Sequence, residues 1–150
     1  MTARPFVFGC VAWLVMLGCS SATQQPASVD TRNDACAHCR MTVSDVRFAG
    51  QIAAKGEEPR FFDDIGCLRD YLSRHALGGD AVAYVADHRT KAWVPRDKAV
   101  YVRNDRVSTP MGSHIIAFAD PASRDADPDG SGTPLAFDEV FGKKGGGLIK

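Results

Sequence analysis

The chain has 150 residues, and its 18 lysine and arginine residues balance 18 aspartate and glutamate residues, so the formal net charge is zero. A chain without excess positive charge lacks the usual electrostatic basis for nucleic-acid binding, and we expect no nucleic-acid partner. The length allows one compact domain or two very small ones.

The first eighteen residues have the pattern of a bacterial lipoprotein signal. Arg4 gives a basic start, residues 6–17 are mostly apolar, and Gly18 precedes Cys19. This apolar run is too short to span a bilayer comfortably. Cleavage before Cys19 would leave this residue at the new N-terminus, where acylation of its thiol and of its amine gives the several chains that stable anchoring requires. An ordinary secretory signal is the alternative. We expect the mature protein on the periplasmic side of a bacterial membrane, lipid-anchored, with the outer membrane favoured over the inner.

The remaining chain is expected to form a tether and two small units. Residues 19–33 are polar and predict a flexible tether. Residues 34–88 and 89–150 predict two α+β units of strand-strand-helix-strand type, the second with a frayed C-terminal tail. A methionine followed by a strand, a polar loop and an aromatic-acidic segment occurs twice, beginning at Met41 and Met111. We interpret this echo as a weak internal duplication.

In the first unit, apolar alternation predicts strands over residues 42–54, 60–62 and 81–86. Asp63 or Asp64 is a good N-cap for a helix after the second strand. We expect this helix to end at the two glycines of residues 78–79.

In the second unit, two short strands are expected over residues 92–94 and 99–102, and a strongly apolar strand over 114–118. Residues 120–133 predict a polar loop, because proline, aspartate, glycine and serine dominate the segment. Residues 134–141 are expected to begin a short strand or helix.

Two thiols, an imidazole and a thioether lie within six residues, at Cys36, His38, Cys39 and Met41. Sulfur donors favour Cu(I) over hard cations. A structural zinc site would favour a second C-x-x-C pair, which this sequence lacks. Arg40 stands where a c-type haem motif requires histidine, which excludes haem attachment. A disulfide or redox pair stays open.

Three cysteines belong to the folded part, namely Cys36, Cys39 and Cys67. Cysteines in an oxidising compartment usually pair, so an odd number favours thiol chemistry over structural disulfides. Cys67 follows the predicted helix start, where it is either a thiol of lowered pKa or a small buried residue.

Four motifs and the signal together resemble the NosL family, the accessory lipoproteins of nitrous oxide reductase. The motifs are C-A-H-C-R-M at 36–41, R-F-A-G-Q at 47–51, F-D-D-I-G-C at 62–67 and T-P-M-G at 109–112. The resemblance covers nearly the whole mature chain. It implies a paired α+β fold related to organomercurial lyase, and a non-enzymatic, periplasmic Cu(I) chaperone. The implied partner is nitrous oxide reductase or its maturation machinery, which assembles a copper-sulfide centre.

The family's Cys-x-Met element corresponds to Cys39 and Met41. On an extended backbone these two side chains would point to the same side and could reach one ion. Cys36 is a less secure ligand, and Met111 is a candidate from the second half.

Further candidate ligands are His38, His114 and Cys67. Two enzymatic alternatives stay open: a thiol-disulfide oxidoreductase using Cys36 and Cys39, and an organomercurial-lyase-like enzyme. A structural lipoprotein is the third alternative. We assign no catalytic residue.

Overall fold

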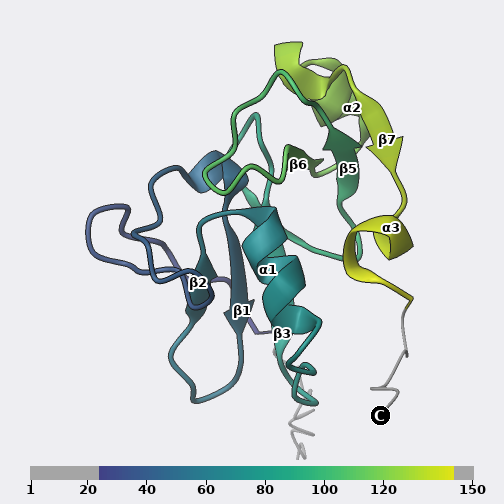
Figure 1. The fold of residues 1–150 in the computed structure, drawn as a ribbon. Helices are drawn as coiled ribbons and strands as arrows, with labels where there is room; N and C mark the ends of the chain where they lie inside the picture. Colours follow the sequence, from purple (N-terminus) through teal and green to yellow (C-terminus); the bar gives the residue numbers. More distant parts are fainter. Residues whose placement is uncertain (1–23, 144–150) are drawn as a thin grey trace, which may run out of the picture.

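The structure is a computed structural model that describes residues 24–143. The expected signal, Cys19 and the end of the C-terminal tail lie outside the described residues. Within residues 24–143, no helix has the length and apolar character needed to cross a membrane. The described chain is α+β, as the sequence predicts, with two small antiparallel sheets (Figure 1).

The first sheet has four strands in the order β2-β1-β3-β4, and every neighbouring pair is antiparallel. Its central strands are buried along nearly their whole length, because α1 covers one face and other segments cover the second. The strands are β1 (Gly50–Ala53), β2 (Arg60–Phe62), β3 (Val82–Ala86) and β4 (Trp93–Pro95).

The second sheet has three antiparallel strands in the order β6-β5-β7. Its strands are β5 (Val100–Arg103), β6 (Ile115–Phe118) and β7 (Thr133–Leu135). In Figure 1 this sheet lies above the first one, with α2 at its far end and α3 between the sheet and α1.

Three short α-helices and two 3-10 turns complete the fold. Asp64 caps the first helix through a hydrogen bond from the backbone N–H of Gly66, as the sequence predicts for one of the two aspartates. These elements are α1 (Ile65–Leu72), α2 (Pro121–Asp125), α3 (Phe137–Phe141), η1 (Val46–Phe48) and η2 (Pro128–Gly130).

One hydrophobic core joins the two sheets. Ile52 and Val85 of the first sheet, Leu68 of α1, and Tyr101 and Ile115 of the second sheet belong to the same buried cluster. A smaller cluster places Phe48 of η1 against Val102, Ile116 and Phe118 of the second sheet. Because α1 contacts both β6 and α3, the helix is one of the structural links between the halves, together with η1 and β3, which also contact β6.

Three sequence-based predictions of local structure are wrong. Of the strand expected over residues 42–54, only β1 forms. The preceding residues bend before Gly50, because the Asp45 side chain caps a 3-10 turn by accepting the N–H of Arg47. The polar loop expected over 120–133 holds α2 and η2, which the side chains of Asp120 and Asp127 cap. The predicted helix is also shorter than expected, since α1 ends at Leu72 and not at the glycines.

The described residues include part of the segment expected to be a tether, and this part packs against the first sheet. The buried amide of Gln51 exchanges two hydrogen bonds with the backbone of Ala27, at 2.8 and 2.9 Å, and Ala27 and Val29 pack beside the first sheet. The expected division at residues 88 and 89 does not coincide with the sheets, because β4 follows it and pairs with β3. Whether the two halves are duplicated units stays a prediction.

Candidate metal centre

Residues 36–41 form a tight loop that closes back on itself. The N–H of Cys36 donates to the carbonyl of Met41 at 2.7 Å, and the N–H of Arg40 donates to the carbonyl of Cys36 at 3.0 Å. An antiparallel bridge between Ala35 and Thr42 closes its base. Cys36 also pairs with Phe61 of β2 in a parallel bridge, which fixes the loop against the first sheet.

The third cysteine comes from α1. Cys67 lies in the first turn of this helix and is 3% exposed, while Cys36 is 0% exposed and Cys39 is half-buried. The sulfur atoms of Cys36, Cys39 and Cys67 all lie within 4.8 Å of one another. No disulfide joins the cysteines of residues 24–143. The fold therefore gathers the three thiols of the described chain into one cluster, which we call the thiol cluster.

Hydrogen bonds within the thiol cluster shift the pKa values of Cys36 and Cys67 in opposite directions. The Cys67 thiol and the N–H of Cys39 donate to Cys36, and the pKa of Cys36 falls well below its usual range despite its burial. The same bond raises the pKa of Cys67, since ionisation would remove the donated proton, and burial adds to the rise. Burial is also the main cause that raises the pKa of Cys39.

Asp64 connects the thiol cluster to the second half of the chain. Its carboxylate is fully buried and accepts hydrogen bonds from the N–H of Gly66 at 2.6 Å and of Met111 at 3.0 Å. Gly66 makes this approach feasible, because a Cβ at that position would lie 2.8 Å from the Cβ of Ser113. The loop that carries Met111 is thus held against the N-terminus of the helix that carries Cys67.

The two methionines lie at the surface. Met41 is 57% exposed and Met111 is 47% exposed, and no other large hydrophobic side chain of the described residues is exposed. The extended backbone assumed for Cys39 and Met41 is absent, because Cys39 is in a turn and Arg40 has a φ of 68°. The geometric reason for pairing these two side chains therefore fails, and their roles as ligands stay predictions.

The two candidate histidines differ in how they are held. His38 is half-buried in the turn between Cys36 and Cys39. His114 follows the Met111 loop, and its Nδ1 lies 2.9 Å from the carbonyl oxygen of Val107. A carbonyl can only accept, so Nδ1 carries the proton and Nε2 has the lone pair that a metal needs.

The structure changes which of the residues predicted from the sequence are favoured as part of the metal site. It groups Cys67 with Cys36 and Cys39, although sequence reasoning gave Cys67 only an even choice between reactive and structural roles. It also reveals Asp63, a fully buried carboxylate beside Cys36 whose pKa is raised mainly by burial. Its Oδ1 accepts hydrogen bonds from the N–H and hydroxyl of Ser44. In the sequence, the F-D-D motif was the available signal for Asp63. Helix capping accounted for this pair of aspartates, so there was no sequence-based reason to connect Asp63 with the thiols.

A second group of potential metal donors was missed entirely. His88, Asp127 and Asp129 offer ligand atoms that lie within 4.8 Å of one another. The aspartates are two residues apart in sequence, a spacing that by itself is common in polar loops. Nothing in the sequence connects them with His88, which lies 39 positions before Asp127.

The fold and the thiol cluster define a small α+β protein with three clustered, largely buried sulfur donors. Comparison with known proteins then gives the family: the NosL family model matches residues 26–142, and the chain belongs to that family. The fold is also similar to a crystal structure of the copper chaperone NosL from Shewanella denitrificans, with a TM-score of 0.57 and 18% sequence identity. The match covers 81% of this chain and 90% of that one. No curated protein matches the chain significantly.

Proposed function

We propose that this protein is a non-enzymatic Cu(I) carrier. In this proposal it holds the ion at the thiol cluster and delivers it to nitrous oxide reductase or to the machinery that matures this enzyme. Membership of the NosL family and the similarity to a protein described as a copper chaperone support the proposal.

The observation that carries the proposal is the approach of three sulfur atoms to within 4.8 Å. Sulfur donors select Cu(I) over hard cations. Metal–sulfur bonds of about 2.3 Å place two sulfurs about 3.8 Å apart in a tetrahedron, so an ion requires the cluster to close by only about 1 Å. The lowered pKa of Cys36 supplies one thiolate, whose single negative charge offsets that of a monovalent cation.

The exposed methionines suit the release of the ion. A thioether is a neutral, soft donor, so it can hold Cu(I) without the charge that would trap it. Met41 is the last residue of the loop that carries Cys36 and Cys39, and Met111 is fixed at the N-terminus of α1 through Asp64. In our proposal the buried thiols store the ion, and the methionines, with His114 and His38 as further candidates, form the path to the recipient.

Lipid anchoring completes the proposal. Cys19 lies five positions before Gln24, the first described residue, and we propose that it is the acylated N-terminus of the mature protein on the periplasmic side of the membrane. Intact-mass measurement of protein extracted from membranes tests this point. An unacylated N-terminus at another residue would contradict it.

The metal preference is tested by anaerobic competition titration of the reduced protein with Cu(I) and Zn(II). We expect one tightly bound Cu(I) per chain, lost in the Cys36→Ser variant and kept in the His75→Gln variant, which removes an exposed histidine at the far end of α1. Zinc binding at the thiol cluster that equals or exceeds Cu(I) binding would refute the proposal.

One observation favours a second candidate function, cleavage of a carbon–mercury bond. Such a reaction requires thiols to bind mercury and an acid to protonate the carbon, and Asp63 lies beside Cys36 with a raised pKa. The Cu(I) carrier is favoured because Cys36 and Cys67 are almost fully buried, which leaves little room for an organic group. Release of benzene from a phenylmercury compound, lost in Asp63→Asn, would support the enzyme. The burial of Cys36 also opposes a disulfide-exchange nucleophile, which must be accessible.

A further inference from the structure

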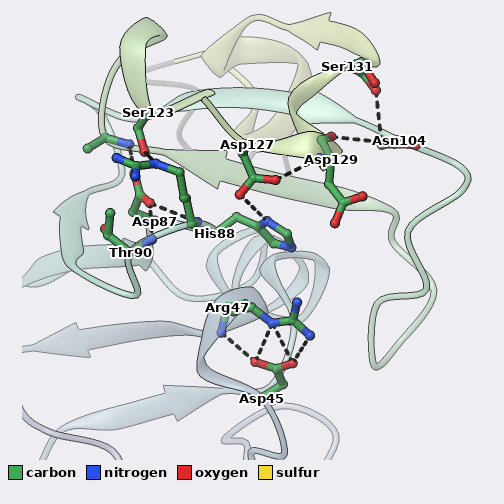
Figure 2. Close-up of polar contacts among 12 residues, drawn as sticks. Asp45, Arg47, Asp87, His88, Thr90, Asn104, Ser123, Asp127, Asp129 and Ser131 are labelled. Atoms are coloured by element: carbon green, nitrogen blue, oxygen red, sulfur yellow. Dashed lines mark hydrogen bonds and ion pairs between the residues drawn. The ribbon is translucent and has the colours of Figure 1, made fainter. Parts of the chain in front are cut away.

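His88, Asp127 and Asp129 form a second cluster of potential donors, which we call the imidazole-carboxylate cluster. His88 follows β3 and its N–H donates to the carbonyl of Ala117 in β6, while Asp127 and Asp129 lie at η2. Figure 2 shows the imidazole between the two aspartates and Arg47. The cluster therefore lies where the first sheet meets the loop that precedes β7.

The strongest indication of a missing ligand is the Nε2 atom of His88. The side chain is 3% exposed, and its Nδ1 lies 3.2 Å from Oδ2 of Asp127. Nε2 is fully buried and has no hydrogen-bond partner, the one such side-chain nitrogen or oxygen among residues 24–143. Buried polar atoms are rarely left without partners, so a specific unsatisfied atom needs an explanation.

The surroundings hold the ring in place. The ring of His88 lies 5.4 Å from the ring of Phe48 and 6.0 Å from that of Phe118. Asp127 is itself fixed, since its Oδ1 accepts the N–H of Asp129 at 2.8 Å. A carboxylate that accepts from one ring nitrogen and leaves the other free is the arrangement that orients metal-binding histidines in proteins.

Charge gives an independent argument for a divalent cation. Asp127, Asp129 and Asp45 bring three half-buried carboxylates to this region, and Arg47 is the half-buried cation that faces them. Arg47 is held by Asp45 in a pair at 2.7 Å, while the more distant charges of Asp129 and Asp127 add to the rise of its pKa. Lys91, which also acts on Asp45, is exposed to solvent. When the imidazole is neutral, the three half-buried carboxylates and the one half-buried guanidinium have a net charge of −2.

We propose that the imidazole-carboxylate cluster binds a divalent transition-metal ion, with Zn(II) as the representative, through Nε2 of His88 and the carboxylate of Asp129. Asp127 holds the imidazole through Nδ1. Imidazole and carboxylate donors suit zinc and related divalent ions, whereas Cu(I) prefers sulfur. One ring nitrogen of His88 and a carboxylate oxygen of Asp129 lie within 4.8 Å of each other, which is close to the separation of about 3.3–3.6 Å that zinc bonds of about 2.0–2.2 Å set between two ligands.

The bound ion would tie η2 to the end of β3 and so brace the two sheets against each other. A ligand that binds only the folded state stabilises it, and the melting temperature rises with ligand concentration. This site is independent of the proposed function, because it uses none of the thiol-cluster residues.

The experiment uses Co(II) as a spectroscopic substitute for Zn(II), titrated anaerobically into the reduced protein with calorimetry and absorption read together. Sulfur ligation gives intense sulfur-to-cobalt charge-transfer bands, and nitrogen-oxygen ligation does not. We expect a class of Co(II) binding without these bands, and a melting temperature that rises with it. Asp129→Asn should weaken this class at least tenfold, because it removes a charged ligand, and His88→Gln should abolish it.

Two variants serve as matched controls: Asp125→Asn removes an exposed carboxylate of the same segment, and His75→Gln removes an exposed histidine. Both should retain the sulfur-free class. Asp129→Asn decides the case if His88→Gln does not fold, since the Asp129 carboxylate accepts no hydrogen bond from residues 24–143 whose loss would destabilise the fold. Absence of the sulfur-free class in the unaltered protein, or its persistence in Asp129→Asn, would overturn the proposal. Either result leaves Cu(I) binding at the thiol cluster a separate question.

Discussion

The thiol cluster and the imidazole-carboxylate cluster are built from opposite kinds of donor. The first gathers three sulfurs from the loop of residues 36–41 and from α1, and the second gathers an imidazole and two carboxylates from the end of β3 and from η2. In both clusters the donor atoms lie within 4.8 Å of one another. The difference in chemical softness between sulfur donors and imidazole-carboxylate donors separates the ions that each cluster can hold.

The two clusters also differ in how they meet solvent. The thiol cluster has exposed methionines close to it in sequence and at the N-terminus of α1, whereas the imidazole of the second cluster is enclosed by aromatic rings and aspartates. An ion that must be passed on needs an open coordination position, while an ion that braces the fold does not. The comparison suggests a transferred ion at the sulfurs and a resident ion at the second cluster.

Replacement of Cys36 should impair metal binding at the thiol cluster and leave the imidazole-carboxylate cluster unchanged. Cys36→Ser removes the thiolate that accepts from Cys67 and from the N–H of Cys39. We expect Cu(I) affinity to fall by more than about 100-fold, beyond the loss typical of outer-shell partners, with Co(II) binding at the second cluster unchanged. Competition titration measures the first and absorption the second.

Cys67→Ser is the matched control for Cys36→Ser, because a serine hydroxyl can still donate to Cys36. Its effect on Cu(I) affinity should be smaller. The sequence alone favoured Cys39 over Cys36 as a Cu(I) ligand. If Cys36→Ser bound Cu(I) as tightly as the unaltered protein, the sequence-based order would be correct.

Loss of the buried cap should show that the thiol cluster depends on contact between the halves. Asp64→Ala leaves the N–H groups of Gly66 and Met111 without their acceptor. We expect the free energy of unfolding to fall by about 2–3 kcal/mol, since unsatisfied buried donors add to the loss of a cap. Asp120→Ala removes an exposed cap and should cost only about 1 kcal/mol. Equal losses in urea denaturation would count against the role of Asp64 as a link.

The pH dependence of Cu(I) binding should reflect the different pKa shifts of Cys36 and Cys39. The pKa of Cys39 is raised, so Cu(I) must displace its proton, whereas Cys36 has a lowered pKa and is already ionised near neutral pH. Affinity should therefore rise with pH, by about tenfold per unit for each proton displaced. A pH-independent affinity between pH 6 and pH 9 would mean that Cys39 is not a thiolate ligand.

A methyl group between the helix and the Met111 loop should perturb the thiol cluster from outside. In Gly66→Ala the new Cβ would lie 2.8 Å from the Cβ of Ser113 and 3.0 Å from Oδ1 of Asp64. Overpacking of about 1–3 kcal/mol outweighs the gain in helix propensity of about 1 kcal/mol, so we expect a net loss of about 1 kcal/mol. Gly78→Ala is the control, because no atom lies within 4 Å of its Cβ. An unchanged melting temperature in Gly66→Ala would show that the loop moves freely.

The smallest effect is expected at the exposed thioether. Met41→Leu keeps the volume and removes a neutral donor that is 57% exposed. The free energy of unfolding should change by less than about 0.5 kcal/mol, and Cu(I) affinity should fall by less than about tenfold, with faster loss of the ion to a chelator. Stopped-flow transfer to a Cu(I) chelator measures this. A loss as large as that of Cys36→Ser would place Met41 in the storage site.

The sequence by itself determined the features that depend on local chemistry. The α+β class, the strands over 60–62 and 81–86, and the cap at Asp64 followed from alternation and capping, which are short-range effects. The motifs also indicated the family and the preference for sulfur-binding metals. The prediction failed at residues 42–49, where alternation suggested a strand and the side chain of Asp45 formed a 3-10 turn instead.

Only the tertiary structure decided which donors meet. Cys67 joins Cys36 because β2 and α1 carry it back against the loop, and His88 meets Asp127 across 39 positions of sequence. Burial was equally invisible in the sequence: Cys36 and Met41 are five residues apart, yet one is fully buried and the other is exposed. The spacing of residues along a chain fixes distances only within one element, whereas the packing of two sheets against α1 fixes the distances between elements, and both clusters are made of residues from different elements.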